Sequence, residues 1–121
     1  LRKGGLKQKY IFGLQLPQIK ELAERFRPAD EKECVDLADS LWEDLECREA
    51  RLTACHLMPP SAMTSDKAQA WAEGVATREE ADILAFRLLR HTAFAESIAE
   101  RLSASGDPLK NYTATAIRRF L

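Results

Sequence analysis

The chain has 121 residues, 45% of which are apolar, and its 18 Lys and Arg against 19 Asp and Glu leave a formal net charge of −1. This length and composition fit one globular domain or a piece of one. No apolar run reaches the roughly 18 to 20 residues that a membrane-spanning helix needs, so we expect no membrane partner. Three cysteines without a CxxC pair are typical of a chain in a reducing compartment, and we expect a cytoplasmic protein.

Charge is unevenly distributed along the chain. Residues 1–27 hold seven Lys and Arg against two acidic residues, residues 28–50 hold two against nine, and the remainder is nearly balanced. A nucleic-acid binder usually presents a basic face. Only the N-terminal stretch and the arginines of the later helices supply one here, so the charge pattern permits binding to a polyanion without requiring it.

The first three predicted helices are bounded by prolines and by a capping residue. We expect residues 1–15 to form a loop or the tail of an earlier helix, after which Pro17 suits a first helical turn and Pro28 ends that helix. Asp30 is expected to cap the second helix, and a pair of prolines ends a third over residues 47–58. The residues expected to face inward are Ile19, Leu22, Ala23 and Phe26, then Val35, Ala38, Leu41, Trp42 and Leu45, then Ala50, Leu52, Ala54, Cys55 and Met58.

Four further helices follow in the same pattern. Residues 64–66 offer caps for a fourth helix, and Thr-Arg-Glu-Glu at 77–80 matches a capping box that opens a fifth. We expect Thr92 to cap a sixth helix that Gly106 closes, and the Asp-Pro pair at 107–108 to open a seventh. The inward residues predicted for these helices are Ala68, Trp71, Ala72 and Val75, then Ala81, Leu84, Ala85 and Leu88, then Phe94, Ile98 and Leu102, then Leu109, Tyr112, Ala116 and Phe120.

Short amphipathic helices can bury their apolar stripes only against each other, usually as antiparallel pairs. We therefore predict an all-α fold, a single helical-repeat domain over residues 1–121. Its helix pairs recur at roughly 35 to 45 residues, which is close to the period of two-helix solenoid repeats, and such stacks leave a concave surface for a ligand. Both ends look cut, because the chain opens on Leu1 and closes inside the last predicted helix, so we expect a fragment of a longer solenoid.

Two stretches carry a family resemblance. One is Tyr10-Ile11-Phe12-Gly13-Leu14-Gln15-Leu16-Pro17 followed by Ile19-Lys20, and the other is Leu41-Trp42-Glu43 with Arg48-Glu49-Ala50-Arg51. They resemble the aromatic-Gly-Val-x-x-Pro segment, the Leu-Trp-acidic turn and the Glu-x-Arg of the DNA alkylation repair family, the AlkD-like glycosylases. The resemblance implies a HEAT-like α-α superhelix, a right-handed solenoid of antiparallel helix pairs, whose concave basic face binds duplex DNA. It also implies excision of cationic alkylated purines by hydrolysis of the N-glycosidic bond.

The resemblance places a site on the fifth and seventh predicted helices. The family's catalytic Asp ends a Trp-Asp-x-x-Asp motif, which falls on Asp82, with Arg78 and Glu79 in place of the Trp and the first acid. A later Trp-x-x-Arg falls near Tyr112 to Thr115, which keeps an aromatic residue and lacks the arginine. Other arginines of the later helices add to a phosphate-facing surface. We expect catalysis by Asp82 and DNA contacts from Arg78, Arg87, Tyr112, Arg118 and Arg119.

Three hypotheses on function stay open: a glycosylase, a non-catalytic binding module for DNA or protein, and a purely structural repeat domain. Asp82 also fits an ordinary acid in the first turns of a helix, where the helix dipole favours negative charge. The spacings of Cys34, Cys47, Cys55 and His56 differ from those of zinc sites, so we expect no metal. The sequence has no Gly-rich phosphate loop, and we expect no cofactor.

Overall fold

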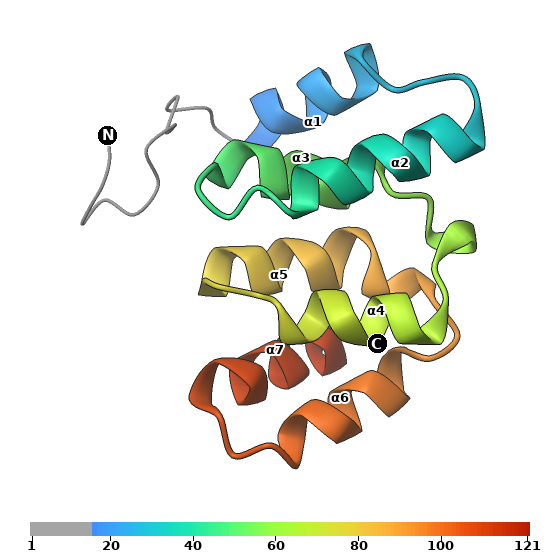
Figure 1. Cartoon of the computed structure of the whole chain (residues 1–121). Coiled ribbons are helices and arrows are strands. Elements are labelled where there is room, and N and C mark those ends of the chain that lie inside the picture. Colours follow the sequence, from blue (N-terminus) through green and yellow to red (C-terminus); the bar gives the residue numbers. More distant parts are fainter. Residues whose placement is uncertain (1–15) are drawn as a thin grey trace. The chain divides into compact units, whose positions relative to one another are not determined.

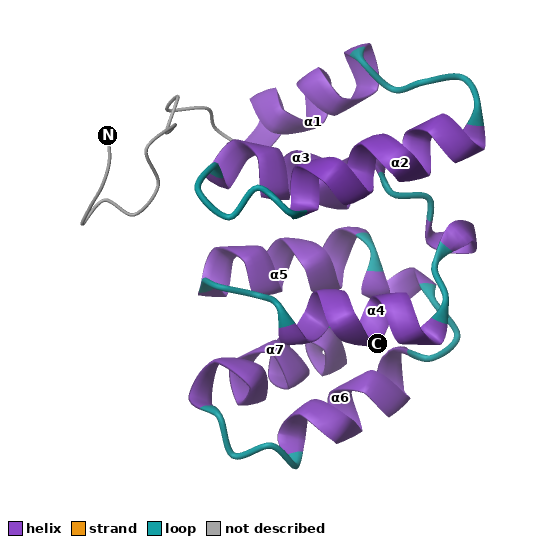
Figure 2. Cartoon of the chain, in the orientation of Figure 1, coloured by secondary structure: helices purple, strands orange, loops and turns teal. Residues whose placement is uncertain are grey.

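The computed structural model describes residues 16–121. These residues form seven α-helices and two short 3₁₀ helices, and they contain no strand (Figures 1 and 2). The predicted all-α fold is therefore confirmed. The prediction of a loop or helix tail over residues 1–15, together with most of the motif that begins at Tyr10, lies outside the described residues.

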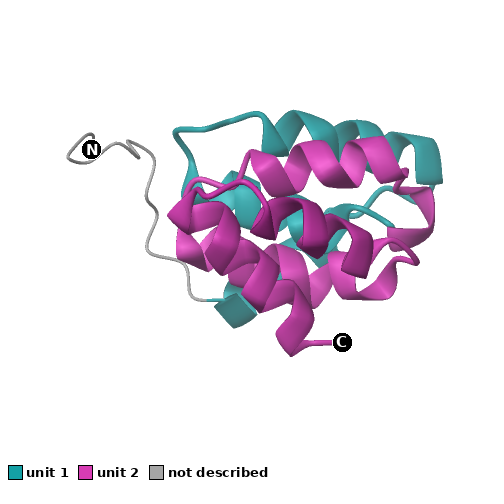
Figure 3. Ribbon diagram, turned by 90° about the horizontal axis from the view of Figure 1, so that it is seen from below, with its two compact units in different colours: residues 1–59 teal, residues 60–121 magenta. Residues whose placement is uncertain are grey.

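The chain divides into two compact units, which are residues 1–59 and residues 60–121 (Figure 3). Within each unit the helices pack against one another. A right-handed solenoid formed by one repeat domain over residues 1–121 stays a prediction, because it depends on how the two units join.

Unit 1 consists of α1 (Leu16–Arg25), α2 (Glu31–Trp42) and α3 (Arg48–Leu57). Helix α2 begins as predicted, because the Asp30 carboxylate accepts a hydrogen bond from the backbone N–H of Glu33 at 3.0 Å. Cys34 Sγ donates to the carbonyl oxygen of Leu57 at 3.0 Å, so α2 starts where α3 ends and the two are antiparallel. Arg27, which follows α1, donates to the same carbonyl at 3.2 Å. Helix α1 therefore runs parallel to α3.

Helix α3 forms the core of unit 1 and is buried on almost all sides. Its buried residues include three polar or charged ones that the apolar stripe did not predict: Glu49, Arg51 and Thr53. The Arg51 guanidinium lies over the Trp42 ring, 3.8 Å from the ring centroid. The Glu49 carboxylate lies 3.1 Å from the guanidinium of Arg48. Buried charged groups are tolerated when they are compensated by contacts of this kind.

Two apolar residues that were predicted to face the core of unit 1 are exposed. Phe26 is 61% exposed and Leu45 is 64% exposed. Phe26 lies one residue beyond the end of α1, and Leu45 lies in the loop between α2 and α3. A helical period places a side chain only while the backbone stays helical, so the prediction was wrong for both residues.

Unit 2 consists of a 3₁₀ helix (Pro60–Ala62), α4 (Ser65–Glu73), α5 (Arg78–Arg87), a second 3₁₀ helix (Leu89–His91), α6 (Ala95–Ser103) and α7 (Pro108–Arg119). Three of its helices carry a predicted cap. Thr64, Thr77 and Asp107 each accept a hydrogen bond from the backbone N–H three residues later, at 3.1, 3.1 and 2.9 Å. Gly106 has a φ of +80°, a left-handed conformation that glycine adopts readily, and it turns the chain from α6 into α7.

The cap predicted for α6 was wrong. The Thr92 hydroxyl donates to the carbonyl oxygen of Leu89 at 2.7 Å, and α6 begins only at Ala95. Thr92 thus closes the 3₁₀ turn that precedes it. A threonine hydroxyl can bond to the backbone of the preceding turn instead of capping the next helix.

In unit 2, α7 packs against both α5 and α6, and α4 packs against α6. Arg101 Nη1 on α6 donates to Gln69 Oε1 on α4 at 3.3 Å. The rings of Phe86 on α5 and Phe120 at the end of α7 meet edge to face, with centroids 5.1 Å apart. Stacked helix pairs of this kind are the element from which helical solenoids are built.

The buried face of α7 is rotated from the predicted one. Leu109, Tyr112 and Phe120 are only half-buried, whereas Thr113 and Ile117 are buried. Helix α7 packs against both α5 and α6, so its most buried face lies between these two helices. Tyr112 consequently lies at the boundary between the core and solvent, where its hydroxyl can reach a polar partner.

Replacing Asp107 by alanine is expected to lower the free energy of unfolding by about 1 kcal/mol, because the backbone N–H of Lys110 in the first turn of α7 loses its side-chain acceptor. Urea denaturation followed by circular dichroism measures the change. Asp107→Asn is the matched control, since asparagine caps a helix about as well as aspartate. An alanine variant as stable as the unaltered chain would show that this cap contributes nothing.

Candidate active site on helices α5 and α7

One face of α5 gathers residues of different chemistry at four-residue spacing: Arg78, Asp82 and Phe86. The capping box fixes the start of this helix. Glu80, which is buried, accepts a hydrogen bond from the backbone N–H of Ala76 at 2.9 Å. Because the first turn is held in this way, Asp82 projects from a defined position, one turn into the helix.

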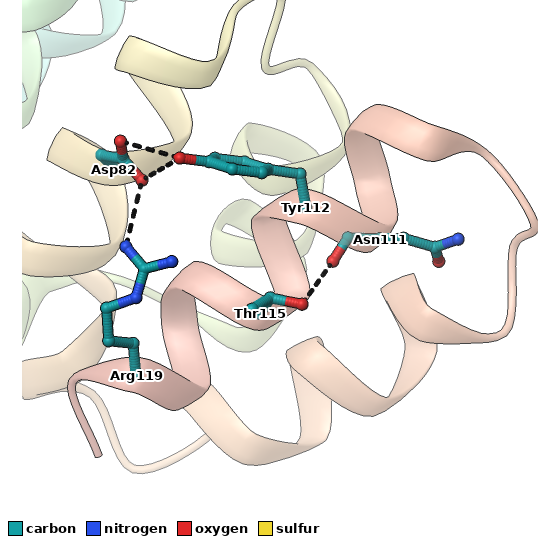
Figure 4. A network of polar contacts seen from close by, with 5 residues as sticks. All are labelled: Asp82, Asn111, Tyr112, Thr115 and Arg119. Atoms are coloured by element: carbon teal, nitrogen blue, oxygen red, sulfur yellow. Dashed lines mark hydrogen bonds and ion pairs between the residues drawn. The ribbon is translucent and has the colours of Figure 1, made fainter.

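The Asp82 carboxylate meets two side chains from α7 (Figure 4). The Tyr112 hydroxyl lies 2.9 Å from Oδ1 and 3.0 Å from Oδ2, so it can donate its single proton to either carboxylate oxygen. Arg119 Nη1 lies 3.9 Å from Oδ1. The Asp82 side chain is 39% exposed. It is therefore oriented by its neighbours and still open to solvent.

A cation covers the aromatic ring of the same site. The Arg78 guanidinium carbon lies 5.0 Å from the centroid of the Tyr112 ring, within the range of a cation–π contact. Tyr112 thus contacts a carboxylate through its hydroxyl and a guanidinium through its ring. The three predicted residues Arg78, Asp82 and Tyr112 are brought together by the fold, although 30 positions separate the last two.

A second cluster continues the site toward the end of α5. Arg87 and Arg90 place their guanidinium carbons 5.5 and 4.2 Å from the centroid of the Phe86 ring. Phe86 in turn packs on Phe120. The α5–α7 face, defined by Arg78, Asp82, Phe86, Tyr112 and Arg119, is therefore flanked at both ends by arginines.

The two neighbouring arginines at the end of α7 point to different partners. Arg119 approaches Asp82, whereas Arg118 Nη2 lies 3.2 Å from the Glu96 carboxylate and its Nη1 donates to Ser103 on α6. Successive helical residues are rotated by about 100°, which directs the two side chains toward different neighbours. Arg118 is thus not part of the Asp82 cluster.

The position at which the resemblance expects an arginine carries no charge. Thr115 is exposed, and its hydroxyl donates to the carbonyl oxygen of Asn111 at 3.1 Å (Figure 4). Arg119 lies one turn later on the same helix. It is therefore the cation of α7 that the structure places beside Asp82.

Of the aromatic residues of this site, Tyr112 was predicted and Phe86 was not. Phe120, which packs on Phe86, was predicted to lie in the core. A signal existed, since Phe86 lies four residues after Asp82 and so shares its helix face. Its pairing with Phe120 could not be predicted, because that contact depends on how α5 packs on α7.

Unit 1 contains an apolar pocket of about 260 Å³ that is lined in part by the side chain of Cys47. Its lining residues are Leu22, Phe26, Leu41, Cys47, Glu49, Ala50 and Thr53. Burial raises the pKa of the Cys47 thiol, and the nearby charges of Asp44 and Glu49 raise it further. A raised pKa keeps the thiol protonated at neutral pH, so Cys47 is not an activated nucleophile.

The alkylation of Cys47 by iodoacetamide is expected to reach its midpoint at a higher pH in the folded chain than in urea. The thiolate is the reactive form, and the raised pKa of Cys47 moves its formation in the folded chain to higher pH. Mass spectrometry of the labelled peptide across a pH series measures both midpoints. A folded midpoint at or below the unfolded one would contradict the raised pKa.

Residues 16–121 contain no group of three or more His, Cys, Asp and Glu that could hold a metal ion. Among the same residues, no helix has the length and apolar character required to span a membrane.

The chain matches a known protein family. A family model described as DNA alkylation repair enzyme matches residues 3–116, which is nearly the whole chain. No significant match was found among curated proteins or among solved structures. The matched range includes Asp82 and Tyr112.

Proposed function

Because the chain belongs to the DNA alkylation repair enzyme family, we propose that it binds duplex DNA with the α5–α7 face and releases cationic alkylated purines. The observation that supports this most directly is the Asp82 carboxylate, held by Tyr112 and Arg119 on an open face. No cofactor and no metal are invoked. The three cysteines form no disulfide among the described residues, which agrees with a reducing compartment such as the cytoplasm.

The arginines supply the contacts to DNA. Arg78 and Arg119 are exposed, Arg87 is half-buried, and all three lie on or beside the α5–α7 face. Guanidinium groups bind phosphate oxygens through paired hydrogen bonds, and this contact does not depend on base sequence. Arg118 would add a contact only outside the Asp82 cluster, since it lies against Glu96.

The chemistry assigned to Asp82 is electrostatic. When the bond between C1′ and the purine nitrogen breaks, its electron pair goes to the base and neutralises the positive charge there. Positive charge then develops on the sugar, where a carboxylate stabilises it. Water adds to C1′ and its proton passes to solvent or to the carboxylate. The cationic base is already a good leaving group, so no acid is needed to protonate it.

The test is base release by the intact chain. Duplex DNA treated with a methylating agent should release N-alkylated purine in the presence of the protein, and untreated duplex should release none. Binding of the duplex should weaken as salt rises, because each phosphate contact displaces a counterion. Base release no faster than in buffer alone would contradict the catalytic part of the proposal.

A second candidate function, a non-catalytic binding module, is favoured by two features of the same site. Thr115 occupies the position of the family's arginine, and both Asp82 oxygens already contact the Tyr112 hydroxyl. A module of this kind would bind duplex DNA with a salt dependence and release no base. Failure to bind duplex even at low salt would leave a protein partner.

A further inference from the structure

An aromatic ring and a carboxylate on the α5–α7 face could bind a planar cation, and both already contact other side chains of the protein. The Tyr112 ring lies under the Arg78 guanidinium, at 5.0 Å from its carbon. The Asp82 carboxylate receives the Tyr112 hydroxyl and lies 3.9 Å from Arg119. Tyr112 is also half-buried, so only part of its ring is accessible. An incoming ligand therefore meets an aromatic surface that a side chain of the protein covers.

The covering group has the same chemical character as the ligand proposed above. A guanidinium is a planar, delocalised cation that stacks on aromatic faces. An N-alkylated purine is likewise a planar cation that is attracted to the face of an aromatic ring. The two compete for one accessible ring surface, and both are attracted to the neighbouring carboxylate.

We infer that Arg78 is a specificity-determining residue, an internal cation on Tyr112 that a planar cationic ligand must displace before it can stack there. This inference rests on the proposed function, which supplies the cationic ligand. Arg78 is exposed and stays hydrated, so its hold on the ring is weak. It weakens cation binding by about two- to five-fold without closing the site.

The inference is tested with a small probe in place of DNA. The intact chain is titrated with 1-methylquinolinium, a permanent planar cation, and with quinoline, which is neutral at mildly alkaline pH, while NMR follows the Tyr112 ring signals. Arg78→Gln should bind the cation about two- to five-fold more tightly than the unaltered chain. Its affinity for neutral quinoline should rise by less, because quinoline displaces the same guanidinium but is neither repelled by its charge nor attracted to the Asp82 carboxylate.

Two further variants separate displacement from a general charge effect. Arg78→Lys keeps a cation at the position and should retain the affinity of the unaltered chain for 1-methylquinolinium. Arg101→Gln removes one positive charge from the same unit at a site paired with Gln69, and it should also leave the affinity unchanged. An equal gain for quinoline, an equal gain in Arg101→Gln, or no detectable binding to Arg78→Gln would overturn the inference.

Failure of this inference and failure of the proposed function give different results. If the probe behaves as expected but no base is released from methylated duplex, the cation site stands and the glycosylase proposal fails. If base is released but Arg78→Gln binds the probe no better than the unaltered chain, the proposed function stands and the role of Arg78 is refuted.

Discussion

An Asp82→Asn chain is expected to release alkylated purine at least about one-hundred-fold more slowly than the unaltered chain. The substitution keeps the size of the side chain and an oxygen that can accept from Tyr112. It removes the negative charge that would face the developing positive charge on the sugar. Loss of one preorganised electrostatic partner typically lowers a rate by about 10²–10³. Chromatography of the released base under single-turnover conditions measures the effect.

The control for this variant is Glu100→Gln, which makes the same change of charge at an exposed position on α6. It should release base at the original rate. Both variants should keep the helical circular dichroism spectrum and the salt-dependent affinity for duplex, because neither removes a buried group. Release by Asp82→Asn at the original rate would refute the catalytic role of this carboxylate and support the non-catalytic module.

Trp42→Ala is expected to destabilise unit 1 by about 3–5 kcal/mol. The indole is 7% exposed at the end of α2, and its removal leaves a cavity against α3. It also takes away the ring on which the buried Arg51 guanidinium stacks at 3.8 Å. Domains are stable by only about 5–15 kcal/mol, so this change approaches the whole stability of a small unit. Urea denaturation followed by circular dichroism measures the loss.

Two neighbouring substitutions calibrate that result. Leu45→Ala changes an apolar residue that is 64% exposed, three positions further on, and should alter stability by no more than about 0.5 kcal/mol. Trp42→Phe keeps an aromatic face for Arg51 and should recover part of the lost stability. If Trp42→Ala proves no more harmful than Leu45→Ala, then the packing of Trp42 and Arg51 is not what holds α2 to α3.

The described helices could be predicted from local signals because each is set by residues close in sequence. The side chains of Asp30, Thr77 and Asp107 cap their helices by accepting a hydrogen bond from the backbone N–H three residues later. Thr92 shows the limit of this reasoning. A threonine has two local uses, capping the next helix or closing the preceding turn, and its residue type does not distinguish between them.

The burial of charged residues was not predictable in the same way. Arg51 is 1% exposed, yet the apolar period of α3 gives no reason to bury it. The Glu-x-Arg motif of the family resemblance, at residues 49–51, was the available signal. The motif identifies Arg51 but does not explain why it is buried. The cause is the Trp42 ring on the neighbouring helix, and that contact forms only when α2 and α3 pack.

The sequence by itself determined an all-α chain, and it predicted Asp82, Tyr112 and the late arginines as site residues. Tertiary structure alone decided which of these meet. Residues 30 positions apart come together only through the packing of α5 on α7, so no local rule could pair Tyr112 with Asp82. The same packing brings Arg119 close to Asp82 and Arg118 close to Glu96, because a step of one residue rotates a side chain by about 100° around the helix.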